Sequence, residues 1–331
     1  MRLKCKGNDH RIKLTSSNVP VQLMTYIKGI FMKKIMLGAI SRNYFNLPIW
    51  IAAHQGMFEQ EGLDVTIDLH EPIDEVWRRL QDGRLDIALG VTEHIILDSE
   101  GGGTLEIIGG NINRLPFSFI SGKDVKTFED LRGRTVGVSS IEAGSSSLVM
   151  KIMSAQGLHY PQDYKIVACG PILARWEMLQ AGKIDAGLQG APLNYIALDQ
   201  GYNSLCEPRE SFPWFQFTSL NVDGRWARAN HATVVAFMRA FIRAHDWFYA
   251  NKAGCQKIAV AETGITPEYA DRAWEEYTQA EIFPRNAQAN PASIQSLIEI
   301  SALLRNVPKR AGTQAHSYIN EAYLNEARQS L

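Results

Sequence analysis

The 331-residue chain has few cysteines, no long apolar run and almost no net charge. Its cysteines are Cys5, Cys169, Cys206 and Cys255, and no two stand at metal-ligand spacing, which argues against a zinc or iron–sulfur site. We expect Cys169 and Cys255 to be free, buried thiols. No apolar stretch reaches the roughly 18 residues of a membrane-spanning helix. The formal net charge of −1 gives no general reason to expect nucleic acid or an anionic membrane as a partner.

The beginning of the chain lacks a clear secretory signal. Residues 32–40 contain two lysines and then apolar residues, as signal peptides do, but the apolar run stops at Ser41. We interpret residues 35–40 as the first core strand and residues 1–32 as an N-terminal extension. Met32 is an alternative start, with a mis-assigned leader upstream. We expect a periplasmic or extracytoplasmic protein if the true start lies elsewhere, and a cytoplasmic one if this N-terminus is genuine.

One segment of the chain occurs twice. Residues 77–89 are echoed by residues 176–188, at an offset of 99 residues, with Trp, Leu, Gln, Gly and Asp in register. Residues 37–41 align with residues 136–140 at the same offset. A repeat of this length is too long for a solenoid unit and indicates two similar lobes, with a cleft for a small molecule between them. We expect Trp77 and Trp176 to be structural, each packed against its own sheet.

Each copy of the repeat has the pattern strand–helix–strand–helix–strand. This order predicts an α/β fold in which each lobe is a βαβαβ unit with a mainly parallel sheet. Ligands of such sheets bind beyond the carboxyl ends of the strands, so the candidate loops are residues 41–46, 90–94, 139–147 and 189–194. The last third of the chain is mostly helical by periodicity, and we expect it to pack onto the first lobe.

Several segments together resemble the two-lobed, type II periplasmic-binding-protein fold. They are residues 47–58, residues 61–65, the Leu-Gln-x-Gly-Arg-Leu-Asp-Ile-Ala segment, and residues 128–138. The chain most resembles the branch that holds sulfonate-, nitrate- and taurine-binding proteins and the thiamine-pyrimidine-synthase-like proteins. The resemblance covers roughly residues 33 to 250. It is specific for the fold and not for a ligand.

The resemblance implies a division of the chain and a partner. The first lobe would be discontinuous, with residues 33–120 plus 221–331, and the second would comprise residues 121–220. Crossing segments near residues 117–122 and 217–222 would act as hinges. Exported members deliver solutes to membrane transporters, so an ABC-transporter permease is the expected partner, and we expect a monomer. The chain lacks the cysteine-rich cluster of the pyrimidine synthases and the signal peptide of the exported proteins.

The most informative polar stretch is the serine loop, residues 139–147, which ends a strand and opens a helix. Unpaired backbone N–H groups and the helix dipole favour an anion there, and Ser139, Ser140, Ser145 and Ser146 add donors. Gly144 lets the backbone approach a ligand closely. The alternative is that one serine simply caps the helix.

The loop after the first strand holds a second set of candidate ligand residues. Arg42 would pair with a carboxylate or sulfonate, Tyr44 would stack on a ring, and Asn43 lies between them. The alternative is a surface loop with one aromatic side chain anchored in the core. After the third strand, Thr92 and Glu93 are further candidates. Glu93 beside His94 suggests an acid/base pair, but adjacent residues on a helix point apart, and ordinary placement of an acid at a helix N-terminus is the simpler interpretation.

The remaining candidates come from the presumed crossings and from the second copy. Arg114 faces the cleft or forms an interlobe ion pair. Gln189 and Asn194 stand in lobe 2 where the loop after the third strand stands in lobe 1, and Trp214 lines the cleft or packs in the core. We assign no catalytic residue, no metal ligand and no cofactor.

These observations favour a solute-binding protein that closes on a small organic molecule, with an anionic or aromatic acid as the expected ligand. One alternative is a cytoplasmic enzyme on the same fold, such as a decarboxylase or a pyrimidine-forming enzyme. Another is an intracellular ligand sensor, although no DNA-binding motif is evident. The sequence contains no convincing nucleophile or metal cluster, which counts against the enzyme.

Overall fold

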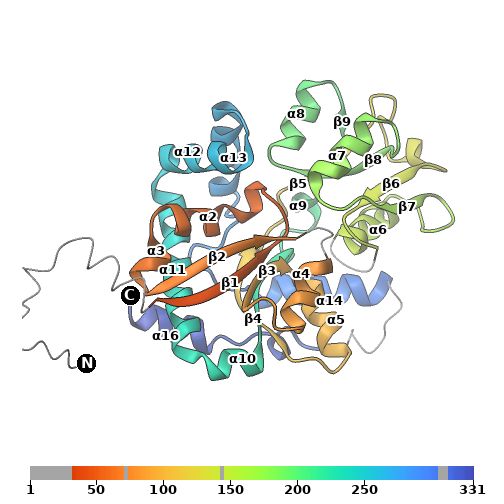
Figure 1. Cartoon of the computed structure of the whole chain (residues 1–331). Coiled ribbons are helices and arrows are strands. Elements are labelled where there is room, and N and C mark those ends of the chain that lie inside the picture. Colours follow the sequence, from red (N-terminus) through yellow and green to blue (C-terminus); the bar gives the residue numbers. More distant parts are fainter. Residues whose placement is uncertain (1–31, 71–73, 142–144, 305–311) are drawn as a thin grey trace, which may run out of the picture.

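The computed structural model describes residues 32–70, 74–141, 145–304 and 312–331. These residues form two five-stranded sheets flanked by helices (Figure 1). Sheet A, in the order β2-β1-β3-β10-β4, contains β1 (Lys33–Ala39), β2 (Leu63–Leu69), β3 (Ile87–Val91), β4 (Leu105–Ile112) and β10 (Thr218–Asp223). Sheet B, in the order β7-β6-β8-β5-β9, contains β5 (Phe117–Ser121), β6 (Thr135–Val138), β7 (Lys165–Ala168), β8 (Ala186–Gly190) and β9 (Asn203–Ser204).

Helices from both halves of the chain cover the two sheets. Lobe 1 is sheet A with η1 (Tyr44–Asn46), α2 (Leu47–His54), α3 (Met57–Gln60), α4 (Asp74–Gln81), α5 (Thr92–Glu100), α10 (Gly224–Ala229), α11 (His231–Ala250), α12 (Lys252–Thr263), α13 (Pro267–Gln279), α14 (Pro291–Leu304), η3 (Ala315–Ser317) and α16 (Ala322–Gln329). Lobe 2 is sheet B with η2 (Glu129–Leu131), α6 (Ser145–Ala155), α7 (Ile172–Gln180), α8 (Leu193–Asp199) and α9 (Pro208–Ser211).

The two sheets have the same topology. In each, the three strands of the repeat pair in parallel, β2-β1-β3 in sheet A and β7-β6-β8 in sheet B. The fourth strand is antiparallel and comes from the other half of the chain: β5 follows β4 into sheet B, and β10 returns to sheet A. This arrangement confirms the predicted α/β class with mainly parallel sheets.

The crossings between the lobes lie a few residues from where the sequence placed them. Residues 117–121 are strand β5 and residues 218–223 are strand β10, so the chain crosses at residues 113–116 and, after α9, at residues 212–217. The predicted boundaries after residues 120 and 220 therefore fall inside the two exchanged strands. The sequence pattern indicates where a strand lies, but it does not show which of two similar sheets the strand joins. The division into domains itself stays a prediction.

Hydrogen bonds of the two repeated aspartates explain why both copies of the repeat have the same spacing. Asp86 accepts a hydrogen bond from the backbone N–H of Met36 (2.8 Å), and Asp185 accepts one from Thr135 (2.9 Å). The two pairs are related by the 99-residue offset found in the sequence. Each aspartate thus joins the start of its lobe's third strand to the first strand, which fixes the register of the parallel pair.

The repeated tryptophans and the cysteines occupy structural positions. Trp176 is buried against Tyr202, with ring centroids 4.9 Å apart, and Trp77 is half-buried beside His94 at 5.5 Å. Cys255 is buried, whereas Cys169 is only half-buried, and both are free thiols. No helix among the described residues is both long and apolar enough to span a bilayer.

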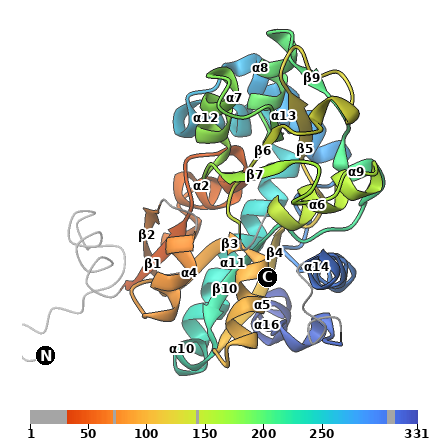
Figure 2. The same ribbon diagram turned by 90° about the vertical axis from the view of Figure 1, so that its right-hand side faces the viewer.

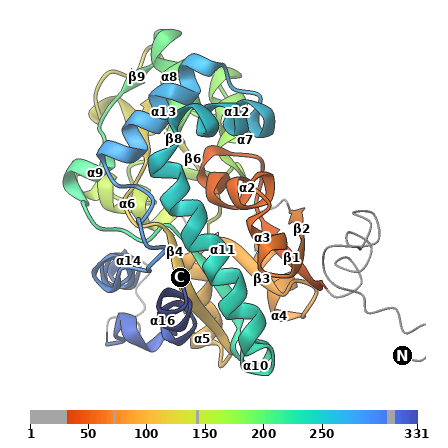
Figure 3. The same ribbon diagram turned by 90° about the vertical axis from the view of Figure 1, so that its left-hand side faces the viewer.

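Most of the carboxy-terminal helices pack onto lobe 1, as predicted, whereas α14 also packs against α6 of lobe 2. The long α11 runs along α2, α3 and α16 (Figure 3). Its apolar stripe contains Val234, Phe237, Phe241 and Phe248, all fully buried. Helices α12 and α13 continue beyond sheet A, and α13 lies beside α8 of lobe 2 (Figure 2). Tyr269 of α13 donates a hydrogen bond from its hydroxyl to Asp199 of α8 (2.7 Å), so lobe 1 overhangs lobe 2 on this side.

His245 of α11 makes the stability of lobe 1 depend on pH. Burial between the rings of Phe241 and Phe283 lowers its pKa to about 4, and its Nδ1–H donates to the carbonyl oxygen of Pro284 (2.6 Å). The unfolded chain takes up a proton near pH 6.5 that the folded protein accepts only near pH 4. The stabilisation is therefore complete above pH 6.5 and is lost as the pH falls toward 4, with a full effect on the order of 3 kcal/mol.

Denaturant unfolding at a series of pH values between 7.5 and 4.5 checks this, with His245→Gln expected to flatten the curve. His231→Gln is the control, because His231 is exposed and pairs with Glu326 (2.6 Å). Equal pH dependence of the two variants would contradict the assignment to His245.

Candidate functional site

A pocket of about 520 Å³ lies between the two lobes, and we call it the interlobe pocket. Lobe 1 lines it with residues 41–44 and with residues 263–266 and Tyr269, from the turn between α12 and α13. Lobe 2 lines it with residues 171–174 and 177 of α7 and with residues 191–193 and 196 of α8. Its volume is in the range of pockets that enclose small organic ligands.

The position of the pocket follows from the topology. The loop after β1 and the residues after β8 stand at the carboxyl ends of parallel strands in their respective sheets, where α/β sheets bind ligands. Helix α7 begins at the pocket, with Pro171 as an N-cap that offers no side-chain acceptor. The first N–H groups of that helix therefore have no partner within the helix.

Most of the interlobe pocket is apolar. Leu173 and Ile196 of lobe 2 face Ile265 of lobe 1 across it, and Leu173 is 57% exposed although it is a large aliphatic residue. Arg42, predicted as an anion partner, does line the pocket, but it pairs with Glu262 and stacks on Trp50 at 5.0 Å. Its charge is thus already compensated inside lobe 1.

Asn43 and Tyr44 add polar atoms to the lobe 1 side of the pocket. The amide of Asn43 donates to Ser41 (3.2 Å), while its buried oxygen Oδ1 has no hydrogen-bond partner among the described residues. Tyr44 is fully buried against Tyr277, with ring centroids 4.8 Å apart, and burial raises the pKa of its hydroxyl. Tyr44 thus lines the pocket and anchors the loop in the core, while its stacking on a ligand ring stays a prediction.

A buried cation lies beneath the serine loop of lobe 2. Arg175 of α7 is 1% exposed and donates from Nη1 to Ser139 Oγ (3.0 Å) and from Nε to the carbonyl of Leu188 (2.8 Å). Ser139 in turn is bonded to Ser145, whose Oγ accepts from the Ser139 N–H at 2.7 Å. Burial lowers the pKa of Arg175 to about 10, so it remains charged at neutral pH. No carboxylate of the described residues pairs with it.

The serine loop contacts lobe 1 directly. Ser147 donates to Glu93 at 3.5 Å from both carboxylate oxygens, and Ser140 donates to Asp74 (3.3 Å). Asp74 also lies 2.9 Å from Nε2 of His94, and that hydrogen bond lowers the pKa of the Asp74 carboxyl. Together with Tyr269–Asp199 on the opposite side, these contacts join the two lobes, and we call this arrangement closed. Ser146 donates to the carbonyl of Ile141 (2.9 Å), and Gly144 lies outside the described residues.

Three other predicted site residues make contacts within their own lobes. Thr92 donates to Ser219 inside sheet A (3.0 Å), and Asn194 donates to Ser118 (3.3 Å). The amide of Gln189, with its nitrogen 3.1 Å from Ile172 O and its oxygen 3.2 Å from Trp176 N, joins β8 to α7. The structure does not bring these three together with residues 41–44, and their roles toward a ligand stay predictions.

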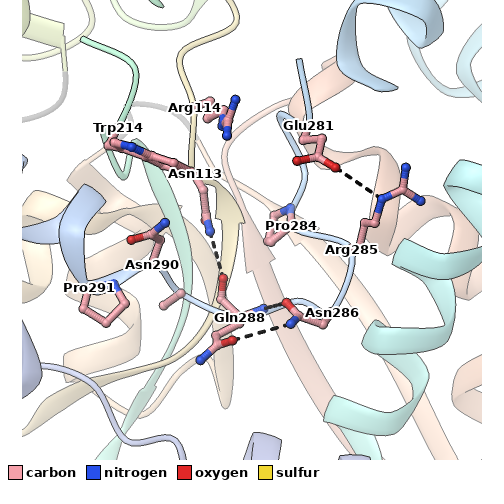
Figure 4. A pocket seen from close by; sticks show the side chains of 11 residues that line it. Asn113, Arg114, Trp214, Glu281, Pro284, Arg285, Asn286, Gln288, Asn290 and Pro291 are labelled. Atoms are coloured by element: carbon pink, nitrogen blue, oxygen red, sulfur yellow. Dashed lines mark hydrogen bonds and ion pairs between the residues drawn. The ribbon is translucent and has the colours of Figure 1, made fainter. Parts of the chain in front are cut away.

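The last two predicted residues, Arg114 and Trp214, meet in a different place. They lie on the two crossing segments and line a second pocket of about 380 Å³, together with residues 281–291 (Figure 4). We call it the crossing pocket. Among the described residues, no cluster of three His, Cys, Asp or Glu side chains is arranged to hold a metal ion.

Several residues of the interlobe pocket were not predicted from the sequence. The turn at residues 263–266 belongs to a helical region that the sequence assigned only to packing, and residues 171–174 precede the repeated Trp176 that was interpreted as scaffold. Arg175 had one usable signal, a basic residue within the apolar face of a predicted helix.

Two facing α/β lobes of equal topology, with a pocket between them at the carboxyl ends of their strands, define a periplasmic-binding-protein fold. Residues 43–253 match the family model described as NMT1/THI5 like. The match covers most of the chain, and the protein belongs to that family. The resemblance predicted from the sequence is thereby confirmed.

Known proteins with the same fold include bacterial solute-binding proteins. The periplasmic nitrate-binding protein NrtA of Synechocystis PCC 6803 is similar at 16% identity with a TM-score of 0.78, covering 91% of this chain and 89% of that one. The alkanesulfonate-binding protein SsuA from Xanthomonas axonopodis pv. citri, bound to MOPS, is similar at 17% identity with a TM-score of 0.71, covering 87% and 98%. At these identities the similarity shows the fold.

The curated sequence relatives are named as enzymes and not as solute-binding proteins. The chain is 27% identical over 168 residues to 4-amino-5-hydroxymethyl-2-methylpyrimidine phosphate synthase of Schizosaccharomyces pombe, covering 50% of this chain and 47% of that protein. The chain thus spans about half the length of the curated relatives it matches.

Proposed function

We propose that the protein is a solute-binding protein that closes its two lobes on a small organic molecule with an apolar body and an anionic end. The observation that carries this proposal is the interlobe pocket, because both lobes line it and neither lobe alone would enclose it. Binding between two lobes couples ligand capture to closure. The nitrate- and alkanesulfonate-binding neighbours support a role of this kind.

The lining defines the class of ligand. Aliphatic residues on both sides of the pocket, including the exposed Leu173, favour an apolar or aromatic body. The first N–H groups of α7, which have no partner within the helix, favour an anionic end of the ligand. Arg175, in the same helix, adds positive charge near them. Since Arg42 is compensated by Glu262, a bare inorganic anion would find little to bind on the lobe 1 side.

Delivery to an ABC-transporter permease is the second part of the proposal. It is supported by the fold that the chain shares with the ligand-binding component of an ABC-type import system, and it implies an extracytoplasmic location. Co-purification of the tagged protein with membrane fractions that contain a permease, in the presence of ligand, tests this part separately from binding.

A thermal-shift screen with carboxylates, sulfonates, nitrate and pyrimidines tests ligand binding. A ligand at about 100 times its Kd adds about 2.7 kcal/mol to the native state, which raises Tm by about 4 °C for a chain of this size. We expect Leu173→Asp to abolish the shift, because a carboxylate in the pocket repels the anionic end of the ligand and disfavours its apolar body. Val167→Asp is the control, since Val167 is also exposed (37%) on lobe 2 but lies on edge strand β7 away from the pocket. Absence of any shift across the screen, or equal shifts in the two variants, would count against the proposal.

The name of the curated relatives favours a pyrimidine-forming enzyme as the second candidate. The same pocket would hold the substrate. Mass spectrometry of each compound after incubation with the protein distinguishes the two functions, because a binding protein returns its ligand unchanged.

A further inference from the structure

The crossing pocket lies where both connections between the lobes meet lobe 1. Arg114 stands on the first crossing and Trp214 on the second, and the connection between α13 and α14 forms the opposite wall (Figure 4). The guanidinium of Arg114 stacks over the Trp214 ring at 4.2 Å, so the two crossings are joined at this point. The volume of about 380 Å³ is large enough for a small organic acid.

The wall of the crossing pocket is held firmly against sheet A. The N–H of Gly110 donates to Ala287 O (2.9 Å), and the Asn113 amide donates to Gln288 O (2.9 Å). A Cβ atom at position 110 would stand 2.4 Å from Gln288 O, so this close approach requires glycine. Glu281 and Ala287 have φ angles of 48° and 55°, a conformation that costs free energy in residues other than glycine. The pocket is therefore a preformed structure and not a gap between mobile loops.

The charges that line the pocket do not cancel. Arg285 donates to Glu281 at 3.4 Å and stacks over Tyr249 at 4.0 Å, so these two charges neutralise each other. Arg114 has no hydrogen-bond or ion-pair partner among the described residues, and its only close partner is the Trp214 ring. A half-buried guanidinium with five free N–H donors at the rim of a polar pocket is suited to a planar or tetrahedral oxyanion.

We propose that the crossing pocket is a second binding site, for a small anion that bears a carboxylate or phosphate group, and that its occupation stabilises the closed arrangement. Arg114 binds the oxyanion, while Trp214 and the amides of Asn286 and Gln288 surround the rest of the molecule. We expect opening of the lobes to bend both crossings and to separate Arg114 from Trp214. An anion that binds across them therefore favours the closed state by its differential affinity.

Calorimetric titration with citrate and with inorganic phosphate, at constant ionic strength, tests the site. We expect one equivalent of at least one probe to bind, and Arg114→Gln to weaken that binding at least tenfold. The control is Arg78→Gln, because Arg78 also stacks over a tryptophan, Trp77 at 6.0 Å, but does not line the pocket. Binding of phosphate alone would assign the site to phosphate groups, and binding of citrate alone to carboxylates. Absence of binding by both probes, or equal affinity of wild type and Arg114→Gln, would overturn the proposal.

The Leu173→Asp variant separates this site from the interlobe pocket, because the added carboxylate repels an anion there. We expect it to bind the probe with wild-type affinity and to show a smaller radius of gyration in small-angle scattering when the probe is present. If Leu173→Asp loses the probe, the anion occupies the interlobe pocket, and the second site is refuted while the proposed function stands. If the probe binds the crossing pocket without changing the scattering, the coupling to closure is refuted.

Discussion

Alanine in place of Gly190 is expected to hold the two lobes apart. Gly190 ends strand β8 of lobe 2, and the ring of Phe45, from η1 of lobe 1, lies directly on it. A Cβ atom at position 190 would stand 2.7 Å from Cζ of Phe45, closer than carbon atoms approach. Phe45 has no room to withdraw, because Phe117 and Phe217 flank it with centroids at 5.4 and 6.3 Å. Overpacking of this kind costs about 1 to 3 kcal/mol.

That cost applies to the closed state and is relieved by opening, so the closed population falls by about fivefold to a hundredfold. We expect Gly190→Ala to increase the radius of gyration in small-angle scattering and to weaken the interlobe ligand by a similar factor, with unfolding otherwise unchanged. Phe45→Leu in the same chain should restore closure by removing the overlapping ring atoms. Gly90→Ala is the matched control, because a Cβ atom there meets only ordinary contacts, at 3.7 Å from Val76. Wild-type scattering from Gly190→Ala would show that this contact does not limit closure.

The fold was largely predictable because its signals are local. The apolar strands, the helices that follow them and the Gly-x-x-Asp step after each Trp helix recur at one offset, and the hydrogen bonds of Asp86 and Asp185 show why the spacing is kept. The exchange of β5 and β10 between the sheets was less visible. Each strand is buried along nearly its whole length although it contains polar residues, so no exposed face marks the sheet to which it belongs, and only the tertiary arrangement decides.

The candidate site was predictable only in part. Residues 41–44 line the interlobe pocket because they follow a parallel strand, and strand order fixes that position. The sequence pattern does not indicate which way the Gln189 side chain points, since all residues of β8 are buried and no alternation separates the two faces of the strand. Arg114 and Trp214 are far apart in the chain, and their stacking depends on how two crossings pass each other. The turn at residues 263–266 reaches lobe 2 only because α11 and α12 carry it there.

Replacing Arg175 by methionine distinguishes a structural role of this residue from a role in ligand binding. Methionine keeps most of the apolar volume of the arginine side chain and removes the charged guanidinium. Burial lowers the pKa of that guanidinium to about 10. That shift corresponds to a cost on the order of 3 kcal/mol for keeping the buried group charged at neutral pH. The variant also leaves the Leu188 carbonyl without its donor, which costs about 1 to 3 kcal/mol. The two effects oppose each other, so we expect the unfolding free energy of the ligand-free protein to change by no more than about 1 kcal/mol.

Binding should respond very differently. The guanidinium supports Ser139 beneath the serine loop and does not line the interlobe pocket, so it acts on a bound anion through its electric field and not through a hydrogen bond. An interaction of this kind contributes on the order of 1 kcal/mol, so we expect Arg175→Met to weaken the best anionic compound of the screen by about threefold to tenfold, while a neutral analogue of the same shape loses little. Arg175→Lys should recover part of the affinity, since it restores the charge without the planar fork. Titration calorimetry with the anion and its neutral analogue measures the difference. If Arg175→Met unfolds more easily by several kcal/mol and binds both compounds as wild type does, Arg175 is a structural residue and the positive charge of lobe 2 has no part in ligand capture.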